Sequence, residues 1–199
     1  MLGRKIIAND VNPLSGILTG PRLHPPRLAE AGTRLGDIPI DQEARPDIDL
    51  SMFYHPRTLA EIGSIKNYLA QKKVADREDD LDRWIRMVAT NRLTGHSKGF
   101  FSVYTLPPNQ AVFPKNQIKI NERQGQKPEY RDAKALILKR TRSLLRNLTQ
   151  ETAGNLIFAP KTSLFLTQEA SRTKKIASDS VQLTVTSAFL NRYFSAPLN

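Results

Sequence analysis

The sequence predicts an α/β fold in which short β-prone runs near both ends of the chain flank a mostly helical middle. The first run is Lys5-Ile6-Ile7-Ala8, and the turn-forming residues Asn9 to Pro13 follow it. Between the two ends, apolar residues recur at spacings of three and four, which is the period of an amphipathic helix. Further β-prone runs lie at 156–158, 164–166 and 181–186. We therefore expect a small sheet that carries a large helical insertion.

Four stretches of the middle predict helices. Residues 14–35 predict helical pieces interrupted by prolines, and 58–74 predicts one uninterrupted helix. The acidic cluster at 76–82 suits the positive N-terminal end of a further helix that runs to Leu93. A fourth helix is expected over 130–148. In the helix that ends at Leu93, we expect Trp84, Ile85, Val88 and Leu93 to be buried and Arg83, Arg86 and Arg92 to face outward.

Two further segments predict irregular structure. Residues 36–50 combine glycine and prolines with acids and are expected to form a loop. Residues 95–112, GHSKGFFSVYTLPPNQAV, are rich in aromatic and turn-forming residues and lack helical spacing, so we expect a loop or a hairpin.

Composition limits the classes of function. The chain has 199 residues, enough for one domain of ordinary size, and it contains no Cys, which excludes disulfides and Cys nucleophiles. Its three His residues are far apart in sequence, so we expect no metal. No apolar run approaches the roughly 20 residues that span a bilayer, and the first residues lack a signal-peptide pattern. A cytoplasmic protein without a membrane partner is expected.

The net charge favours a polyanionic partner. Lys and Arg number 30 against 19 acids, for a formal charge of +11. The excess is concentrated in residues 114–147, where ten basic residues stand against three acids. Such a stretch either contacts the phosphates of a nucleic acid or forms the solvated face of a helix. The ten candidates are Lys115, Lys119, Arg123, Lys127, Arg131, Lys134, Lys139, Arg140, Arg142 and Arg146.

Asp10 follows the first predicted strand. In doubly wound nucleotide-binding sheets, a carboxylate at the tip of a strand accepts hydrogen bonds from the ribose hydroxyls of the cofactor. The segment Asn9-Asp10-Val11-Asn12-Pro13 equally suits the cap of the next helix. Both roles remain open for Asp10 at this point.

Several longer stretches carry a resemblance to a known family. They are GRKIIANDVNPLSGIL, FYHPRTL, LDRWIRMVATNRLTGHSKGFFSVYTLPPNQAV, INERQGQKPEYRDAKALILKRTRSLLR and SVQLTVTSAFLN. Together they resemble the DNA methyltransferases that use S-adenosylmethionine to methylate the exocyclic amino group of adenine or cytosine. The resemblance implies a partial Rossmann-like sheet. It implies a cofactor-binding half over 1–35, a helical insertion that recognises the target over 36–154, and strands leading to the catalytic motif over 155–199.

The resemblance also implies roles for single residues. Asp10 matches the ribose-binding acid, and Glu169, in Gln168-Glu169-Ala170-Ser171, matches the acid of a motif that contacts the adenine of the cofactor. Ser187 and Phe189 match the catalytic motif, in which a polar side chain orients the target amino group and an aromatic ring stacks on the flipped base. Phe100, Phe101 and Tyr104 would face DNA, or pack in the core.

The sequence departs from the family in two places. The motif Ser187-Ala188-Phe189 lacks the usual prolines, and no Gly-x-Gly pair is present for the loop that cradles the methionine portion of the cofactor. We therefore expect a truncated, weakly active or inactive form. The alternatives are one half of a split methyltransferase whose second polypeptide supplies the Gly-rich loop, a non-catalytic DNA-binding module, and a truncated gene product without function.

Overall fold

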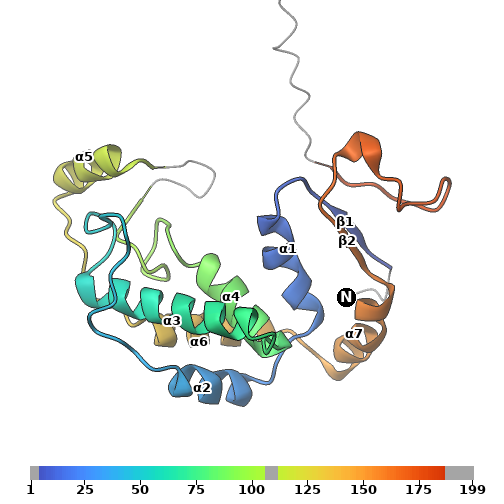
Figure 1. The fold of residues 1–199 in the computed structure, drawn as a ribbon, viewed down its shortest axis with the longest axis horizontal. Coiled ribbons are helices and arrows are strands. Elements are labelled where there is room, and N and C mark those ends of the chain that lie inside the picture. Colours follow the sequence, from blue (N-terminus) through green and yellow to red (C-terminus); the bar gives the residue numbers. More distant parts are fainter. Residues whose placement is uncertain (1–4, 106–111, 187–199) are drawn as a thin grey trace, which may run out of the picture.

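The computed structural model describes residues 5–105 and 112–186 and has a mixed α/β architecture. A small parallel sheet lies at one end of the molecule, and a body of helices makes up the rest (Figure 1). The elements in chain order are β1 (Ile7–Asn9), α1 (Leu14–Thr19), the 3-10 helix η1 (Gly20–Leu23), α2 (Leu28–Asp37), α3 (Pro56–Val74), α4 (Asp80–Thr90), α5 (Pro114–Gln124), α6 (Ala133–Leu145), α7 (Gln150–Thr162), β2 (Leu164–Leu166) and the 3-10 helix η2 (Ala170–Arg172).

The helical body forms where the spacing of apolar residues predicts it. Helices α4 and α6 lie inside the segments expected at 76–93 and 130–148, and α3 covers the segment expected at 58–74 and begins two residues earlier, at Pro56. Proline suits this first helical position because its fixed φ matches the helix and its missing N–H has no partner to lose. Helix α4 begins after Asp79, whose carboxylate accepts a hydrogen bond from the backbone N–H of Asp82 at 2.8 Å.

The main core lies between α2, α3, α4 and α6 and not beside the sheet. The Nε1–H of Trp84 donates to Thr141 Oγ1 at 3.1 Å, so the indole of α4 is both buried and satisfied by α6. The helical body can thus hold its own packed interior. The buried core residues are Leu35, Ile38, Phe53, Tyr54, Ile65, Leu69, Trp84, Ile85, Met87, Val88, Phe101, Ala133 and Ile137.

An ion-pair cluster joins α2 to the start of α4. Arg34 donates to Asp82 at 2.5 Å and to Asp79 at 2.8 Å, and the Asp82 side chain is completely buried. A buried carboxylate is tolerated only when it is paired and hydrogen-bonded. Arg34 and the helix start together meet this condition.

The sheet consists of two parallel strands among the described residues. Ile7 pairs with Leu164, Ala8 with Phe165 and Asn9 with Leu166. Parallel strands need a long crossover, and here the whole helical body forms it. The β-prone runs near the start of the chain and at 164–166 therefore pair with each other, which the sequence alone did not specify.

Two other β-prone runs are not strands. Residues 156–158 lie within α7. That helix begins after Thr149, whose side chain accepts a bond from the backbone N–H of Thr152. Residues 181–186 form no strand and are exposed. A β-rich sequence needs a neighbouring strand to pair with, and none borders this run in the part of the chain that the structure describes.

Two other sequence predictions need correction, and one helix was not predicted. Leu93, expected to be buried, is 37% exposed, because α4 ends at Thr90 and Leu93 lies beyond its packed face. Arg86, expected to face outward, is half-buried, where it pairs with Glu78 and donates to the backbone carbonyl of Leu69. Helix α5 was not predicted, although Pro114 at its first position and Gly125 after its last residue are typical helix boundaries.

Neither a membrane span nor a metal cluster is found within residues 5–105 and 112–186. None of the helices there combines the length and the apolar character that crossing a bilayer requires. No group of three His, Asp or Glu side chains in that part of the chain is arranged to hold a metal ion.

Candidate cofactor edge and nucleic-acid interface

The parallel pair of strands brings two predicted site residues to one edge. Asp10 directly follows β1, and Gln168-Glu169 follows β2 after one intervening residue. The backbone N–H of Asp10 donates to the Leu166 carbonyl at 3.2 Å, and the backbone N–H of Gln168 donates to Asn9 Oδ1 at 3.1 Å. Ligands of open α/β sheets bind at the carboxyl ends of the strands. We call the loops 10–15 and 167–169 the carboxyl edge.

Asp10 organises the turn between β1 and α1. Its carboxylate accepts bonds from Ser15 Oγ at 2.5 Å and from the backbone N–H of Asn12 at 2.9 Å. The bond from Ser15, which has the larger effect, and the bond from the Asn12 backbone both lower the pKa of Asp10. The carboxylate is exposed and ionised near neutral pH, so it has room for further donors such as ribose hydroxyls. Asp10 does not cap α1, whose N-cap is Pro13 without a side-chain bond, so the expected capping role is wrong, while the bonds that Asp10 makes in the turn leave the binding role open.

The second loop of the carboxyl edge offers two acceptors. Glu169 is exposed and pairs with Arg172 at 3.4 Å. The Oε1 atom of Gln168 is buried and has no hydrogen-bond partner among the described residues. An unpaired buried acceptor is unfavourable, and a ligand that donates a hydrogen there would remove the penalty. Sequence reasoning assigned the role to Glu169 alone, since nothing in the sequence reveals that the Gln168 oxygen is left unpaired.

The predicted catalytic residues Ser187 and Phe189 lie outside the described residues. The structure therefore neither joins them to the carboxyl edge nor separates them from it.

Two of the ten predicted DNA-binding residues serve the helical body. Arg131 donates to the backbone carbonyls of Phe100 at 2.8 Å, Ser97 at 3.3 Å and Ser102. Burial lowers the pKa of Arg131. Lys134 Nζ donates to the Ile38 carbonyl at 2.6 Å, just beyond the C-terminal end of α2. Both side chains fix loops in place.

The other eight basic residues form no ion pair within the part of the chain that the structure describes. Lys115, Lys119 and Arg123 are spaced four apart on α5 and are all exposed. Lys139, Arg142 and Arg146 form a similar exposed row along α6 and its C-terminal end, opposite Ile137 and Thr141. We call these sets the α5 row and the α6 row. Lys127 follows α5, and Arg140 is half-buried, where its charge contributes, after burial, to a lowered pKa of Arg92.

Helix α5 is held by a polar seam. Gln117 and Gln126 both donate to the Tyr104 carbonyl, at 2.9 and 3.0 Å, and Asn121 donates to the Met52 carbonyl at 2.8 Å. Gln117 is fully buried on the side of α5 that faces these loops, together with Ile120. Because the amides bond to fixed backbone atoms, they set the rotation of α5 and turn the α5 row to solvent.

The three predicted DNA-facing aromatic residues have different surroundings. Phe101 is 1% exposed and belongs to the core. Phe100 is half-buried beneath the guanidinium of Arg92, 4.2 Å from the ring centroid. Tyr104 is 39% exposed, next to the seam that holds α5. Tyr104 alone of the three is exposed beside a basic row.

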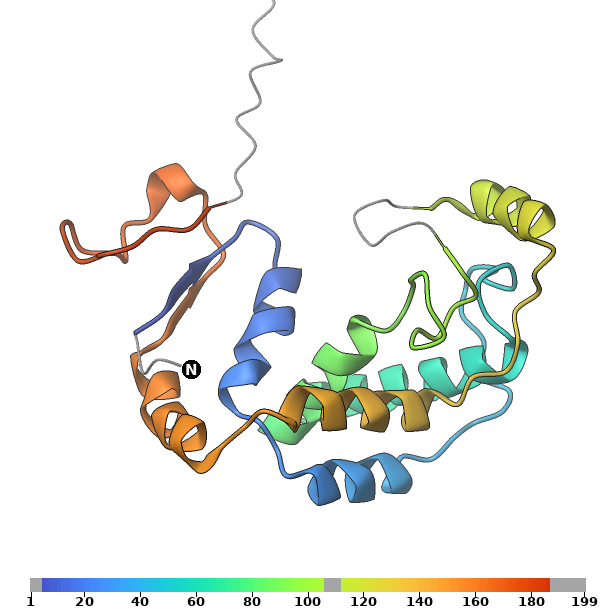
Figure 2. The same cartoon turned by 180° about the vertical axis from the view of Figure 1, so that it is seen from behind.

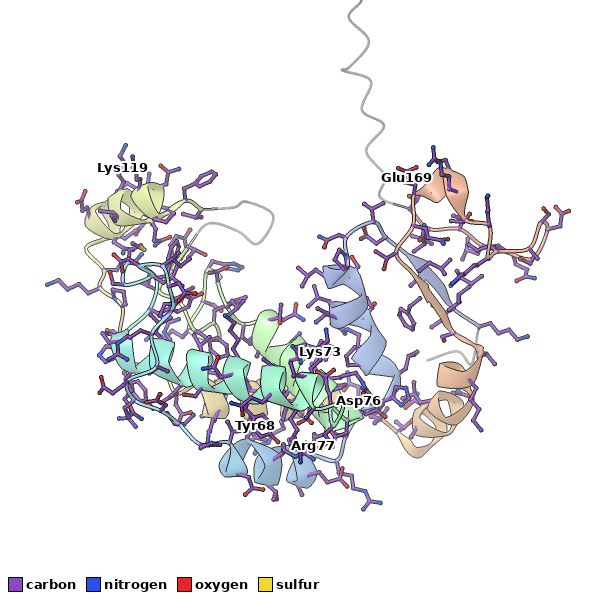
Figure 3. All side chains as sticks on the ribbon, in the orientation of Figure 1. Tyr68, Lys73, Asp76, Arg77, Lys119 and Glu169 are labelled. Atoms are coloured by element: carbon purple, nitrogen blue, oxygen red, sulfur yellow. The ribbon has the colours of Figure 1, made fainter. Side chains whose placement is uncertain are left out.

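The carboxyl edge and α5 lie at opposite ends of the molecule's long axis but on the same side of the helical body (Figures 1 and 2). Figure 3 shows Glu169 and Lys119 projecting on that side.

Comparisons with protein-family models, with curated proteins and with solved structures found no match to this chain.

Proposed function

We propose that this chain acts within an S-adenosylmethionine-dependent DNA methyltransferase that modifies the exocyclic amino group of adenine or cytosine. The observation that carries the proposal is the parallel pairing of β1 with β2, which brings Asp10 and Gln168-Glu169 to one edge. The family resemblance assigns Asp10 and Glu169 to the cofactor, although 159 positions separate them. Two motifs this far apart in the sequence are not expected to meet at one edge of a sheet by chance.

The chemistry of the carboxyl edge suits S-adenosylmethionine. Asp10 supplies an ionised acceptor for the two ribose hydroxyls, and Gln168 Oε1 supplies a buried acceptor for the adenine amino group. When bound, the cofactor supplies the electrophilic methyl group. Gly-x-Gly is absent from the sequence, so the methionine portion lacks its usual cradle. We therefore expect measurable but weak cofactor binding and little or no turnover by this chain.

Binding of labelled S-adenosylmethionine by equilibrium dialysis tests the proposal. We expect Asp10→Asn to weaken binding about tenfold, the loss of roughly 1.4 kcal/mol that one charge-assisted hydrogen bond accounts for. Asp49→Asn is the matched control, since Asp49 is an exposed carboxylate that accepts the backbone N–H of Ser51 at 2.9 Å in a similar turn away from the sheet. Equal affinity of both variants, or no binding by the wild type, would refute the cofactor role.

Gln168→Met separates the two acceptors. The substitution keeps the length of the side chain and removes the unpaired oxygen, so the free protein should be as stable as the wild type or more stable. We expect cofactor binding to weaken by a factor of several while thermal stability is kept. S-adenosylmethionine and its 6-deamino analogue should lose their difference in affinity in this variant, because the missing amino group is the donor that Gln168 accepts.

Double-stranded DNA is the macromolecular partner that we propose. The α5 row and the α6 row present cations without acidic partners among the described residues, and α5 lies on the same side of the body as the carboxyl edge. Binding should weaken with salt, with a slope that falls by about one for each phosphate-contacting Lys that is removed. A triple Gln variant of the α5 row and one of the α6 row, compared in salt titrations, would show which row contacts phosphates.

A non-catalytic DNA-binding module is the second candidate, and the uncompensated basic rows favour it. It predicts salt-dependent duplex binding without any affinity for S-adenosylmethionine, so the two binding assays discriminate the candidates. In a split enzyme, a second polypeptide would supply the Gly-rich loop. Each described strand has one neighbour, which leaves an outer edge where a further strand can pair. Activity that appears only on mixing with that polypeptide would support this form of the proposal.

A further inference from the structure

Phe113 is the most exposed aromatic side chain in the described part of the chain. It is 71% exposed, whereas Tyr104, Tyr130 and Phe165 are each about 38–39% exposed. A single exposed apolar residue is ordinary on a protein surface. The surroundings of Phe113 are what distinguish it.

The backbone of Phe113 is fixed although its ring is free. Phe113 is the N-cap of α5, with φ −74° and ψ 151°, and Pro114 occupies the first helical position. The Phe113 carbonyl accepts bonds from the backbone N–H groups of Asn116 at 2.9 Å and Gln117 at 3.0 Å. The ring therefore projects from a rigid point at the start of the helix, so holding it in place on binding costs little conformational entropy.

The α5 row begins two residues after Phe113. Lys115, Lys119 and Arg123 continue along the exposed side of the helix, and Ile118, 44% exposed, lies on the same side as Lys115 and Lys119. Glu122 is the one acid on this helix. An exposed aromatic residue at the start of a helix that carries a line of cations suits a nucleic acid, because cations neutralise phosphates and an aromatic ring can stack on a base.

We propose that Phe113 is the base-stacking wedge of this protein, inserted at an opened step of double-stranded DNA while the α5 row contacts the flanking phosphates. This inference rests on the proposed function for its partner, DNA, and assigns a surface that is separate from the carboxyl edge. Wedges of this kind stack on unpaired or unstacked bases and prefer duplexes in which one step is already weakened.

Fluorescence anisotropy with two labelled duplexes, one fully paired and one with a single mismatch, tests the inference. We expect the wild type to prefer the mismatched duplex. Phe113→Ala should lower affinity about tenfold, within the range measured for stacking on one base, and abolish the preference without altering the salt slope. Lys119→Gln should reduce the salt slope by about one and keep the preference.

Two further variants make the result specific. Phe113→Leu keeps an apolar side chain of similar size and loses the ring, so a stacking role predicts that it behaves like Phe113→Ala. Phe165→Ala removes an exposed ring from β2 at the other end of the molecule and should leave both duplex affinities unchanged.

The outcomes separate the inference from the proposed function. Salt-dependent binding with unaltered affinity and preference in Phe113→Ala overturns the wedge alone. Wild-type duplex affinity and mismatch preference in Phe113→Leu would overturn the wedge, because stacking needs the ring. Self-association of the wild type in sedimentation that Phe113→Ala abolishes, while DNA binding persists, would overturn it in favour of apolar docking between proteins. Absence of duplex binding by the wild type overturns the DNA partner and the wedge together, whereas cofactor binding is measured independently.

Discussion

Arg34 pairs with two carboxylates at the start of α4, those of Asp79 and Asp82, so three charged side chains meet at this point of the helical body. Burial tends to raise the pKa of Asp79, but the hydrogen bond from Arg34 and that from the backbone N–H of Asp82 outweigh burial and lower it to about 2. This hydrogen bond, which Arg34 donates to Asp79, is also the largest cause of the raised pKa of Arg34. The cluster therefore links the protonation state of one carboxylate to the stability of the fold.

Asp79→Asn should reduce the loss of stability in acid. A carboxylate whose pKa is lower in the folded than in the unfolded protein stabilises the fold above its unfolded value of 3.8, and the stabilisation disappears as the pH falls towards about 2. Asn keeps the helix cap but cannot titrate. Urea midpoints from about pH 5 to about pH 2 should fall less steeply in the variant. Equal slopes would contradict the assigned pKa.

Arg131→Gln tests whether this residue stabilises the fold and does not bind DNA. Removing the guanidinium leaves several backbone carbonyls of the loop 97–102 without their donor, so the free energy of unfolding should fall by about 1–3 kcal/mol. Lys139→Gln, at an exposed position of the α6 row, should leave stability within about 0.5 kcal/mol. Chemical denaturation measures both variants. A drop in duplex affinity under conditions where Arg131→Gln is fully folded would mean that Arg131 contacts DNA.

The basic stretch shows what a sequence can and cannot predict about single residues. Counting charges correctly indicates an excess of exposed cations, and none of the ten candidates forms an ion pair with a carboxylate among the described residues, although Arg131 and Lys134 bond to backbone carbonyls. It cannot predict that Lys134 bonds to carbonyls at the end of α2, because that contact joins residues 96 and 98 positions apart. The same holds for the unpaired oxygen of Gln168.

At the scale of elements, α3 is followed by a residue with a strained backbone conformation. Asp76 has φ 52° in the left-handed region, where the backbone N–H of Arg77 reaches the Lys72 carbonyl at 2.9 Å and closes the helix. Figure 3 shows Asp76 with Lys73 and Arg77 at this end of the helix. Glycine adopts this conformation without the penalty that a Cβ atom introduces.

Asp76→Gly should therefore raise the free energy of unfolding by about 0.5–1 kcal/mol, and Asp76→Ala should lower it by a similar amount. Thermal unfolding followed by circular dichroism would measure both. The pair is its own control, since each variant removes the same carboxylate. Stabilisation by Ala as well as Gly would mean that the charge, and not the backbone conformation, sets the stability of this helix end.

Periodicity predicts the helices of the body better than it predicts the strands. Helices α3, α4 and α6 each bury apolar residues at helical spacing, interspersed with buried polar residues such as Ser64, Asp82 and Thr141, so the local pattern and the final packing agree. Residues 156–158 and 181–186 have β propensity, yet one run is helical and the other is irregular. Strand formation depends on a partner elsewhere in the chain, and a single run of residues cannot reveal that partner.

At the scale of the whole molecule, stability and the candidate cofactor site lie in different places. The main core connects α2, α3, α4 and α6, whereas the sheet has two strands of three residues each among the described residues. Contacts of α1 and η1 with α4 join the two regions, and His24 pairs with Asp80 across this junction at 3.3 Å. A site on the thinner region can adjust to a ligand while the core stays intact.

Hydrogen exchange followed by mass spectrometry should reveal this division. Amides of α3, α4 and α6 should exchange slowest, because only global unfolding exposes them, and those of β1 and β2 should exchange through smaller openings. Saturating S-adenosylmethionine should slow exchange in peptides covering residues 7–15 and 164–169 and leave α6 unchanged, since a ligand stabilises the openings that its contacts close. The Asp10→Asn variant, at the same cofactor concentration, is the control and should show weaker protection of both peptides. Equal intrinsic protection of β1 and α4 would contradict the separation of core and site. Cofactor-dependent slowing spread evenly over α6 would instead mean that the sheet and the helical body open as one unit.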